Sequence, residues 1–295
     1  MTTRTRLVLA CTGSPRTAAA IPLLARQYGA DVVTVTLDLG QGGDLDDVRE
    51  RALAAGAVRA HVLDVREEFA REYILPALRA GALQATGGPA RAALECAIVA
   101  GKLVEIAQIE QAAIAAHGCL PDTADQARIE AAVRALDASL RIIAIPASTA
   151  LSATMSGARP MVPAPDAPAC VELTFDRGTP VAINGVEMTL TELLDSVATI
   201  AAGHAVAQDV VQAAHEALEV VVTPATLLDS KREHGARYAA MIERGAWFSP
   251  ERDALDALCA ARQDKVTGTV RVELFKGACT VAGRRSPFAL EPARA

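Results

Sequence analysis

The fold is decided by residues 6–38, which read RLVLACTGSPRTAAAIPLLARQYGADVVTVTLD. An apolar run at Arg6–Cys11 leads through a short turn into a helix-length stretch rich in Ala and Leu at Thr17–Tyr28. Gly29 then separates this stretch from a second, β-branched run at Asp31–Asp38, as a glycine does at the end of a helix. A strand, a helix and a strand in this order predict a βαβ unit with two parallel strands.

The same alternation continues through the first half of the chain. Further strands are expected at Val58–Asp64, Ala112–His117 and Arg141–Ile145, and helices at Asp44–Ala55, Glu67–Ala80, Ala92–Gln108 and Thr123–Asp137. Each of these helices is long enough to cross back over a sheet. The predicted fold class is therefore α/β, with a parallel sheet and crossover helices.

A change of composition ends this region. From about Pro146 to Pro168 the chain is rich in Pro, Ala, Ser and Met and loses its helical period, so we predict domains at 1–150 and 165–290. For the second, smaller α+β domain we expect strands around an Asp176-Arg177-Gly178 turn, a helix at Leu190–Ala202, two or three helices between Gln208 and Arg262 (one covering Lys231–Gly245), and two antiparallel strands turning near Lys276-Gly277. Trp247 and Phe248 are expected to anchor its core.

Composition limits the functions that the chain can have. The 295 residues are 51% hydrophobic and 22% charged, which excludes a disordered chain, and the 3% aromatic content leaves the core to aliphatic side chains. A net charge of −6 offers no basic surface to nucleic acid or to an anionic membrane. Because the chain has no apolar run of about 20 residues and no N-terminal signal pattern, we expect a cytoplasmic protein. Six scattered cysteines are expected to be free thiols, and the histidine spacing predicts no metal site.

The turn after the first strand, Cys11–Thr17, is a candidate anion site. Backbone N–H groups and the helix dipole hold anions where a parallel strand runs into a helix. Ser14 and Pro15 are also the residues of an ordinary N-cap and first helical position. An anion site and a simply capped helix are therefore both open from these residues alone.

Six segments in order resemble the argininosuccinate synthase family, within the adenine-nucleotide-hydrolase-like ATP pyrophosphatases. They are VTVTLDLGQGGDLDDVRERALAAGA from Val33, VLDVREEFAREYILPALRAGAL from Val62, GKLVEIAQ from Gly101, HGC with DQARIE from His117 to Glu130, FDRGTPVAING from Phe175 and GAWFSPERDAL from Gly245. The resemblance implies a Rossmann-like nucleotide-binding domain, ATP with Mg²⁺, and the ligation of citrulline to aspartate with release of AMP and pyrophosphate, a step of arginine biosynthesis. By position it implies nucleotide contacts from Ala10, Thr12, Gly13, Ser14, Arg16, Thr17, Leu37, Asp38 and Gly118, and substrate contacts from Asp125 and Arg128. It assigns no catalytic residue.

The chain departs from the family pattern at the expected site. In the family loop A-Y-S-G-G-L-D-T-S, Ser14 replaces the second glycine, Pro15 removes an N–H donor and Arg16 replaces the acidic residue. This predicts either impaired nucleotide handling or a rewired anion site, since a guanidinium can bind phosphate. Hydroxyls of the substrate clamp Y-P-L-G-T-S-L-A-R are missing at Gly88–Cys96, and Asp122 stands where the family has a lysine. Asp125 and Arg128 suit one helix face, as a substrate site or as a structural ion pair.

Two longer differences bear on assembly and activity. A family segment is missing between Ile145 and Met161, and the C-terminal tail that family members exchange between subunits is expected to be absent. This argues against the family tetramer and leaves a smaller homo-oligomer open. We therefore expect an argininosuccinate synthase-like protein whose native activity is weak or absent. The alternatives are a ligase with a changed amino-acid substrate and a non-catalytic partner that binds nucleotide or protein.

Overall fold

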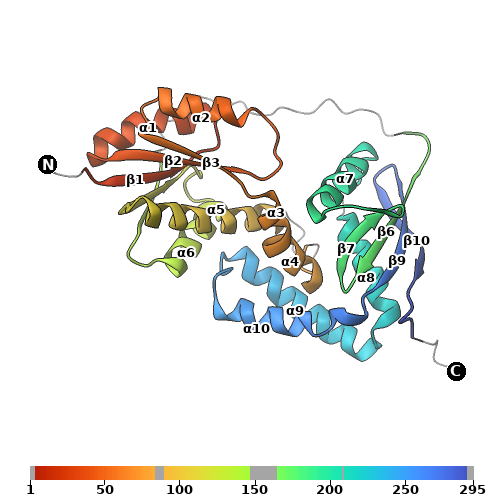
Figure 1. Ribbon diagram of the computed structural model, residues 1–295. Coiled ribbons are helices and arrows are strands. Elements are labelled where there is room, and N and C mark those ends of the chain that lie inside the picture. Colours follow the sequence, from red (N-terminus) through yellow and green to blue (C-terminus); the bar gives the residue numbers. More distant parts are fainter. Residues whose placement is uncertain (1–3, 84–89, 147–164, 208, 291–295) are drawn as a thin grey trace. The chain divides into compact units, whose positions relative to one another are not determined.

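The computed structural model describes residues 4–83, 90–146, 165–207 and 209–290 (Figure 1). They divide into two compact units that are not contiguous in sequence. The first unit spans Met1–Phe69, Ala92–Gly157 and Met241–Ser249, and the second spans Ala70–Arg91, Ala158–Ala240 and Pro250–Ala295. Most of the compositional boundary expected from about Pro146 to Pro168 lies outside the described residues. Ala70–Arg91 groups with the second unit although it precedes that boundary.

The first unit contains a five-stranded parallel sheet, as predicted. Its strands are β1 (Arg6–Ala10), β2 (Asp31–Asp38), β3 (Arg59–Asp64), β4 (Ile114–His117) and β5 (Arg141–Ala144), in the spatial order β3-β2-β1-β4-β5. The helices α1 (Pro15–Tyr28), α2 (Leu45–Ala54), α3 (Arg66–Phe69), α5 (Ala90–Ile109) and α6 (Ala124–Leu136) accompany it. Every expected strand and crossover helix of this half is present except one, the helix expected at Glu67–Ala80.

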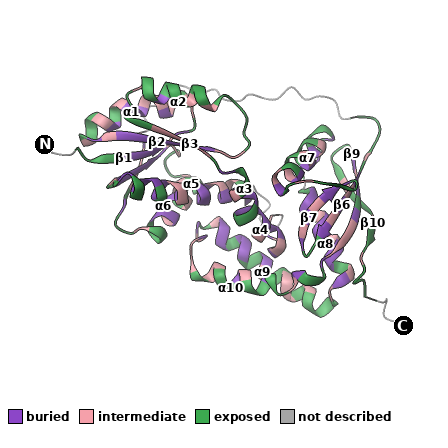
Figure 2. Cartoon of the chain, viewed as in Figure 1, coloured by how far each residue is buried: buried purple, intermediate pink, exposed green. Residues whose placement is uncertain are grey.

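Aliphatic side chains form the core of the first unit. Figure 2 shows β1 and β2 buried, because a parallel strand has neighbours on both faces. Leu7 and Leu9 of β1 pack with Ile21 and Leu24 of α1, and all four are at most 1% exposed. Trp247 is buried in the same unit, within Met241–Ser249, so its expected place in the second domain was wrong.

The helix predicted at Glu67–Ala80 is three pieces. Helix α3 runs into a π-helical turn, η1 (Ala70–Ile74), and then into α4 (Leu75–Ala80). Pro76 lies in the first turn of α4, where its missing N–H removes the hydrogen bond that would continue a regular helix. The boundary between the two units falls within this irregular stretch, between Phe69 and Ala70.

The second unit is built on a five-stranded antiparallel sheet. Its strands are β6 (Ala169–Asp176), β7 (Thr179–Ile183), β8 (Val186–Glu187), β9 (Gly268–Phe275) and β10 (Ala278–Arg285), in the order β10-β9-β6-β7-β8. The helices are α7 (Leu190–Gly203), α8 (Val210–Val222), α9 (Ala225–Glu243) and α10 (Pro250–Ala260), with a 3₁₀ turn, η3, at Gln263–Lys265. The two predicted hairpins, β6–β7 and β9–β10, form one sheet because β6 pairs with β9. Helices α7 and α8 pack on this sheet, in a core that includes Phe175, Val272 and Leu274.

All six cysteines lie in the described part of the chain and are free, as predicted. Among the helices of the described ranges, none is both long and apolar enough to cross a membrane.

We expect Gly245→Ala to lower the free energy of unfolding of the first unit by about 2 kcal/mol. Gly245 has φ +72°, and a Cβ there would lie 2.7 Å from Cα of Arg128. Gly42→Ala is the matched control, since Gly42 has φ +71° with nothing within 4 Å, and should cost only about 1 kcal/mol. Urea unfolding followed by the fluorescence of Trp247, the single tryptophan, measures both losses. Equal losses would contradict the steric argument.

Candidate functional site

The predicted nucleotide-contacting residues lie at or just after the carboxyl ends of three neighbouring strands of the parallel sheet; Ala10 ends β1, and Leu37 and Asp38 end β2. Strand β1 lies between β2 and β4, so the connections from β1 and β4 leave in opposite directions at the carboxyl ends of these strands. Residues of the β1 turn, the end of β2 and Gly118 after β4 therefore share one edge of the sheet. This is the position at which α/β proteins bind ligands.

The turn after β1 is ordered by its own hydroxyls. Ser14 caps α1 by accepting a hydrogen bond from the backbone N–H of Thr17 at 3.4 Å, and the Thr17 hydroxyl donates to the Ser14 carbonyl at 2.9 Å. The Thr12 hydroxyl donates to Ser14 Oγ at 3.2 Å. Gly13 has φ +74°, whereas Ser14 has φ −69°. The serine in place of the second glycine thus carries no backbone strain. Ser14 can therefore cap α1 in a turn that also binds an anion.

Arg16 connects this turn to the end of β4. Its Nη1 donates to the Gly118 carbonyl at 2.9 Å, while Nε and Nη2 are buried and, within the described residues, have no hydrogen-bond partner. A Cβ at Gly118 would lie 3.2 Å from Thr17 Cγ2, so this close approach favours glycine. Unpaired buried donors are costly, and an anion is their natural partner.

Asp38 and Leu37 hold the turn after β2. Asp38 Oδ1 accepts from the backbone N–H of Gly40 at 2.9 Å, and its Oδ2 lies 3.5 Å from Nε of Arg66. The Leu37 carbonyl accepts from the Gln41 side chain at 2.7 Å. The carboxylate of Asp38 is therefore already engaged by a backbone amide and by a guanidinium.

His117 and Glu130 belong to this edge but were not among the predicted site residues. His117 is 1% exposed, its Nδ1 accepts from the Cys119 backbone N–H at 3.3 Å, and its Nε2 lies 3.7 Å from Glu130 Oε1. Burial lowers the pKa of His117 below its usual value, and this outweighs the opposing effect of Glu130. The neutral ring orients the backbone of the turn after β4. The sequence signal for this role was the His-Gly-Cys run at a strand end.

Asp125 and Arg128 do share one face of α6, and they form an ion pair. Arg128 Nη1 lies 2.8 Å from Asp125 Oδ1, Nη2 lies 2.5 Å from Glu243 Oε2, and Nε donates to the Glu243 carbonyl at 2.8 Å. No local sequence pattern predicts that Glu243, the last residue of α9, pairs with Arg128. Substrate binding by Asp125 and Arg128 stays a prediction, and a substrate carboxylate would have to compete with two carboxylates for the same guanidinium.

The donor set at the β1 turn fits an anion better than a metal ion. Arg16 brings a positive charge to the turn, and Asp38, the one carboxylate among the residues predicted to contact nucleotide, is engaged by Arg66. In the described ranges, no three or more His, Cys, Asp or Glu side chains are grouped to hold a metal. The turn can therefore hold a phosphate through Arg16 and backbone amides.

Fold and site together define an α/β protein with a strand-to-helix turn at the carboxyl edge of a parallel sheet, where Arg16 has two buried donors without a partner among the described residues. Residues 6–156 match the N-terminal HUP domain of argininosuccinate synthase and residues 205–293 match its C-terminal domain. The chain belongs to the argininosuccinate synthase family.

Curated relatives named argininosuccinate synthase match nearly the whole chain. That of Oleidesulfovibrio alaskensis is 34% identical over 97% of this chain and 89% of its own length. That of Dictyoglomus thermophilum is 32% identical over 97% and 89%, and that of Geobacillus thermodenitrificans is 34% identical over 97% and 87%. The first alignment spans 357 residues, more than the 295 of this chain, so that relative carries segments that this chain lacks.

A solved structure of a universal stress protein in complex with cAMP covers 50% of this chain and 98% of its own at 17% identity. Its TM-score of 0.29 is too low to bear on the fold.

Proposed function

We propose that the chain binds ATP at the turn after β1 and is an argininosuccinate synthase-type ligase whose reaction with citrulline and aspartate is weak or absent. The observation that carries the proposal is Arg16, whose guanidinium joins the β1 turn to Gly118 and keeps two buried donors without a partner among the described residues. A triphosphate oxygen would satisfy both donors. The guanidinium then supplies positive charge to the phosphates, a role that a metal ion has in other nucleotide sites.

The loss of native activity rests on the substrate side. Arg128 is held by Asp125 and Glu243, and Asp122 brings a negative charge where the family has a lysine. Several missing hydrogen bonds to charged substrate groups, at about 1.5–3 kcal/mol each, reduce the rate by orders of magnitude. The same ion pairs favour a second candidate, a ligase that takes a different amino acid or a protein that binds nucleotide without catalysis. A cytoplasmic location and a homo-oligomer are part of the proposal.

Two measurements test the proposal separately. Calorimetric titration with ATP, with and without Mg²⁺, should show binding in both conditions. Absence of heat and of a thermal shift at millimolar ATP would overturn nucleotide binding. ATP–pyrophosphate exchange with citrulline and aspartate should be at least about 100-fold slower than for the Oleidesulfovibrio alaskensis enzyme in parallel, given two lost charged hydrogen bonds. Exchange at the same rate would overturn the loss of activity. Exchange with another amino acid would identify a ligase with a changed substrate, and ATP binding without any exchange would identify a protein that binds nucleotide without catalysis.

A further inference from the structure

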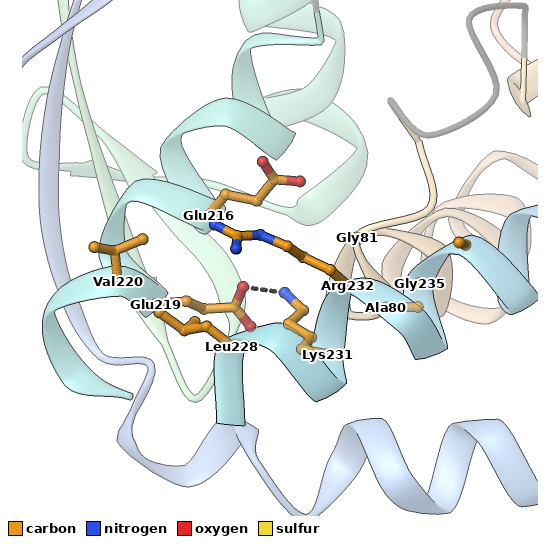
Figure 3. A pocket seen from close by; sticks show the side chains of 10 residues that line it. Ala80, Gly81, Glu216, Glu219, Val220, Leu228, Lys231, Arg232 and Gly235 are labelled. Atoms are coloured by element: carbon orange, nitrogen blue, oxygen red, sulfur yellow. Dashed lines mark hydrogen bonds and ion pairs between the residues drawn. The ribbon is translucent and has the colours of Figure 1, made fainter. Parts of the chain in front are cut away.

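The second unit contains a cavity of about 330 Å³ on the face where α8, α9 and the end of α4 meet (Figure 3). It is lined by Ala80, Gly81, Glu216, Glu219, Val220, Leu228, Lys231, Arg232, Gly235 and Ala236. None of these residues belongs to the β1 turn, to the end of β2 or to the turn after β4. The cavity is therefore a separate feature from the proposed ATP site.

A glycine inside α9 shapes this cavity. A Cβ at Gly235 would lie 2.6 Å from the carbonyl oxygen of Ala80, so the close crossing of α9 over the end of α4 requires a residue without a side chain. Glycine weakens the interior of a helix, and here it allows the backbone of Ala80 and Gly81 to form one wall.

The charge of Lys231 is neutralised by Glu219. Figure 3 shows the Lys231 ammonium bonded to the Glu219 carboxylate, and Gln263 Nε2 donates to Glu219 Oε1 at 3.4 Å. His215 Nδ1 lies 3.6 Å from Glu219 Oε2. Burial alone would raise the pKa of Glu219, but His215 and Lys231 hold it below its usual value. Glu219 is thus a compensated carboxylate.

Glu216, one helical turn before Glu219, forms no ion pair within the described residues, although the charges of Lys231 and His215 act on it. Its Oε1 accepts from the neutral amide of Gln212 at 2.8 Å, and no cation of the described residues lies within ion-pair distance of its carboxylate. Arg232 pairs instead with the exposed Asp229, at 3.0 Å. Burial raises the pKa of Glu216 by more than the charges of Lys231 and His215 lower it, so a cation brought to its carboxylate gains more than it would at an exposed site.

We propose that this cavity binds a small aliphatic cation, with a guanidinium or ammonium head on the Glu216 carboxylate and an alkyl stem against Val220 and Leu228. The volume is at the lower end for ligand sites and suits a small molecule rather than a peptide. The apolar side chains that line it stabilise a stem, and the carboxylate selects a positive head.

Calorimetry with n-butylguanidinium tests the proposal, with n-butylurea as its neutral isostere. The cation should bind and the urea should bind at least about 10-fold more weakly, the factor expected for one charge-assisted hydrogen bond. Glu216→Gln should lose at least the same factor. Glu233→Gln, the same exchange at an exposed position of α9, should bind like the parent.

Ala236→Leu adds a steric test that leaves Glu216 in place. Ala236 is an exposed residue at the cavity wall, so a larger side chain there fills the cavity without entering the core. This variant should weaken binding at least about 10-fold while its thermal unfolding stays that of the parent. Equal binding of cation and urea, or parent-like binding by Glu216→Gln, would overturn the proposal. Because ATP binding is measured at other residues, either proposal can fail alone.

Discussion

Replacing Glu110 with glutamine should lower the free energy of unfolding of the first unit by about 3 kcal/mol. Glu110 follows α5 and is 1% exposed, and its carboxylate meets Arg6 Nη1 at 2.9 Å, Arg59 Nη1 at 2.5 Å and His61 Nε2 at 2.9 Å. Arg6 begins β1 and Arg59 begins β3, so one carboxylate ties together two strands that flank β2. Removing one partner of a buried ion pair costs about 3–5 kcal/mol of unfolding free energy. Because Arg6 and Arg59 are half-exposed, water can solvate them when the carboxylate is lost, and we expect a loss at the lower limit of this range.

Trp247 fluorescence during urea unfolding measures this loss, with Glu50→Gln as the control at an exposed position. The pH dependence gives an independent check. Burial raises the pKa of Glu110, but its bonds to His61 and Arg59 and the charges of both arginines bring it below 4.5. Its contribution is therefore complete above pH 4.5 and is lost as the pH falls through the lower folded-state pKa. The Glu110→Gln variant should lose less stability between pH 5 and 3, and equal losses in variant and parent would contradict the assignment.

The parallel sheet could be predicted because its determinants are local. Val32–Thr36 of the run at Asp31–Asp38 are all β-branched, Gly29 ends the preceding helix, and the strand found there has the predicted bounds. Each element carries its own signal of apolar period and capping residue. Right-handed crossovers then limit the strand orders that such a sheet can adopt.

The errors arose where distant residues decide the structure. The stretch Glu67–Ala80 has a helical period throughout, yet Pro76 and packing in two different units divide it into three pieces. Trp247 lies in a segment far along the chain that packs in the first unit. No local pattern in either stretch reports which unit it joins.

In the candidate site, too, features set by neighbouring residues could be predicted and features set by distant residues could not. Ser14 as N-cap and Gly13 with positive φ follow from neighbours in the sequence, and both are present. The partner of Arg16 is a carbonyl 102 positions away, and the second carboxylate on Arg128 is 115 positions away. Such partners follow from the tertiary fold, so the sequence left two interpretations open for each arginine.

Replacing Arg16 with alanine should weaken ATP binding about 100-fold, which is the second large effect expected. The two buried donors, Nε and Nη2, are the hydrogen bonds that ATP gains, and two charge-assisted bonds at about 1.5 kcal/mol each correspond to that factor. Arg26→Ala is the matched control, because Arg26 is exposed on the last turn of the same helix. Calorimetry without Mg²⁺ measures both affinities.

The exchange Arg16→Asp, which restores the acidic residue of the family loop, separates a structural arginine from a phosphate-binding one. If Arg16 supplies the positive charge that a triphosphate requires, the aspartate variant should bind no ATP without Mg²⁺ and regain binding when Mg²⁺ is added, because only then is the loop's negative charge bridged to the phosphates. Arg16→Lys should retain partial affinity, since an ammonium keeps the charge but loses the planar pair of donors. If Arg16 only links the β1 turn to Gly118, all three variants should lose stability to a similar extent and none should change its response to Mg²⁺, which would contradict the assignment.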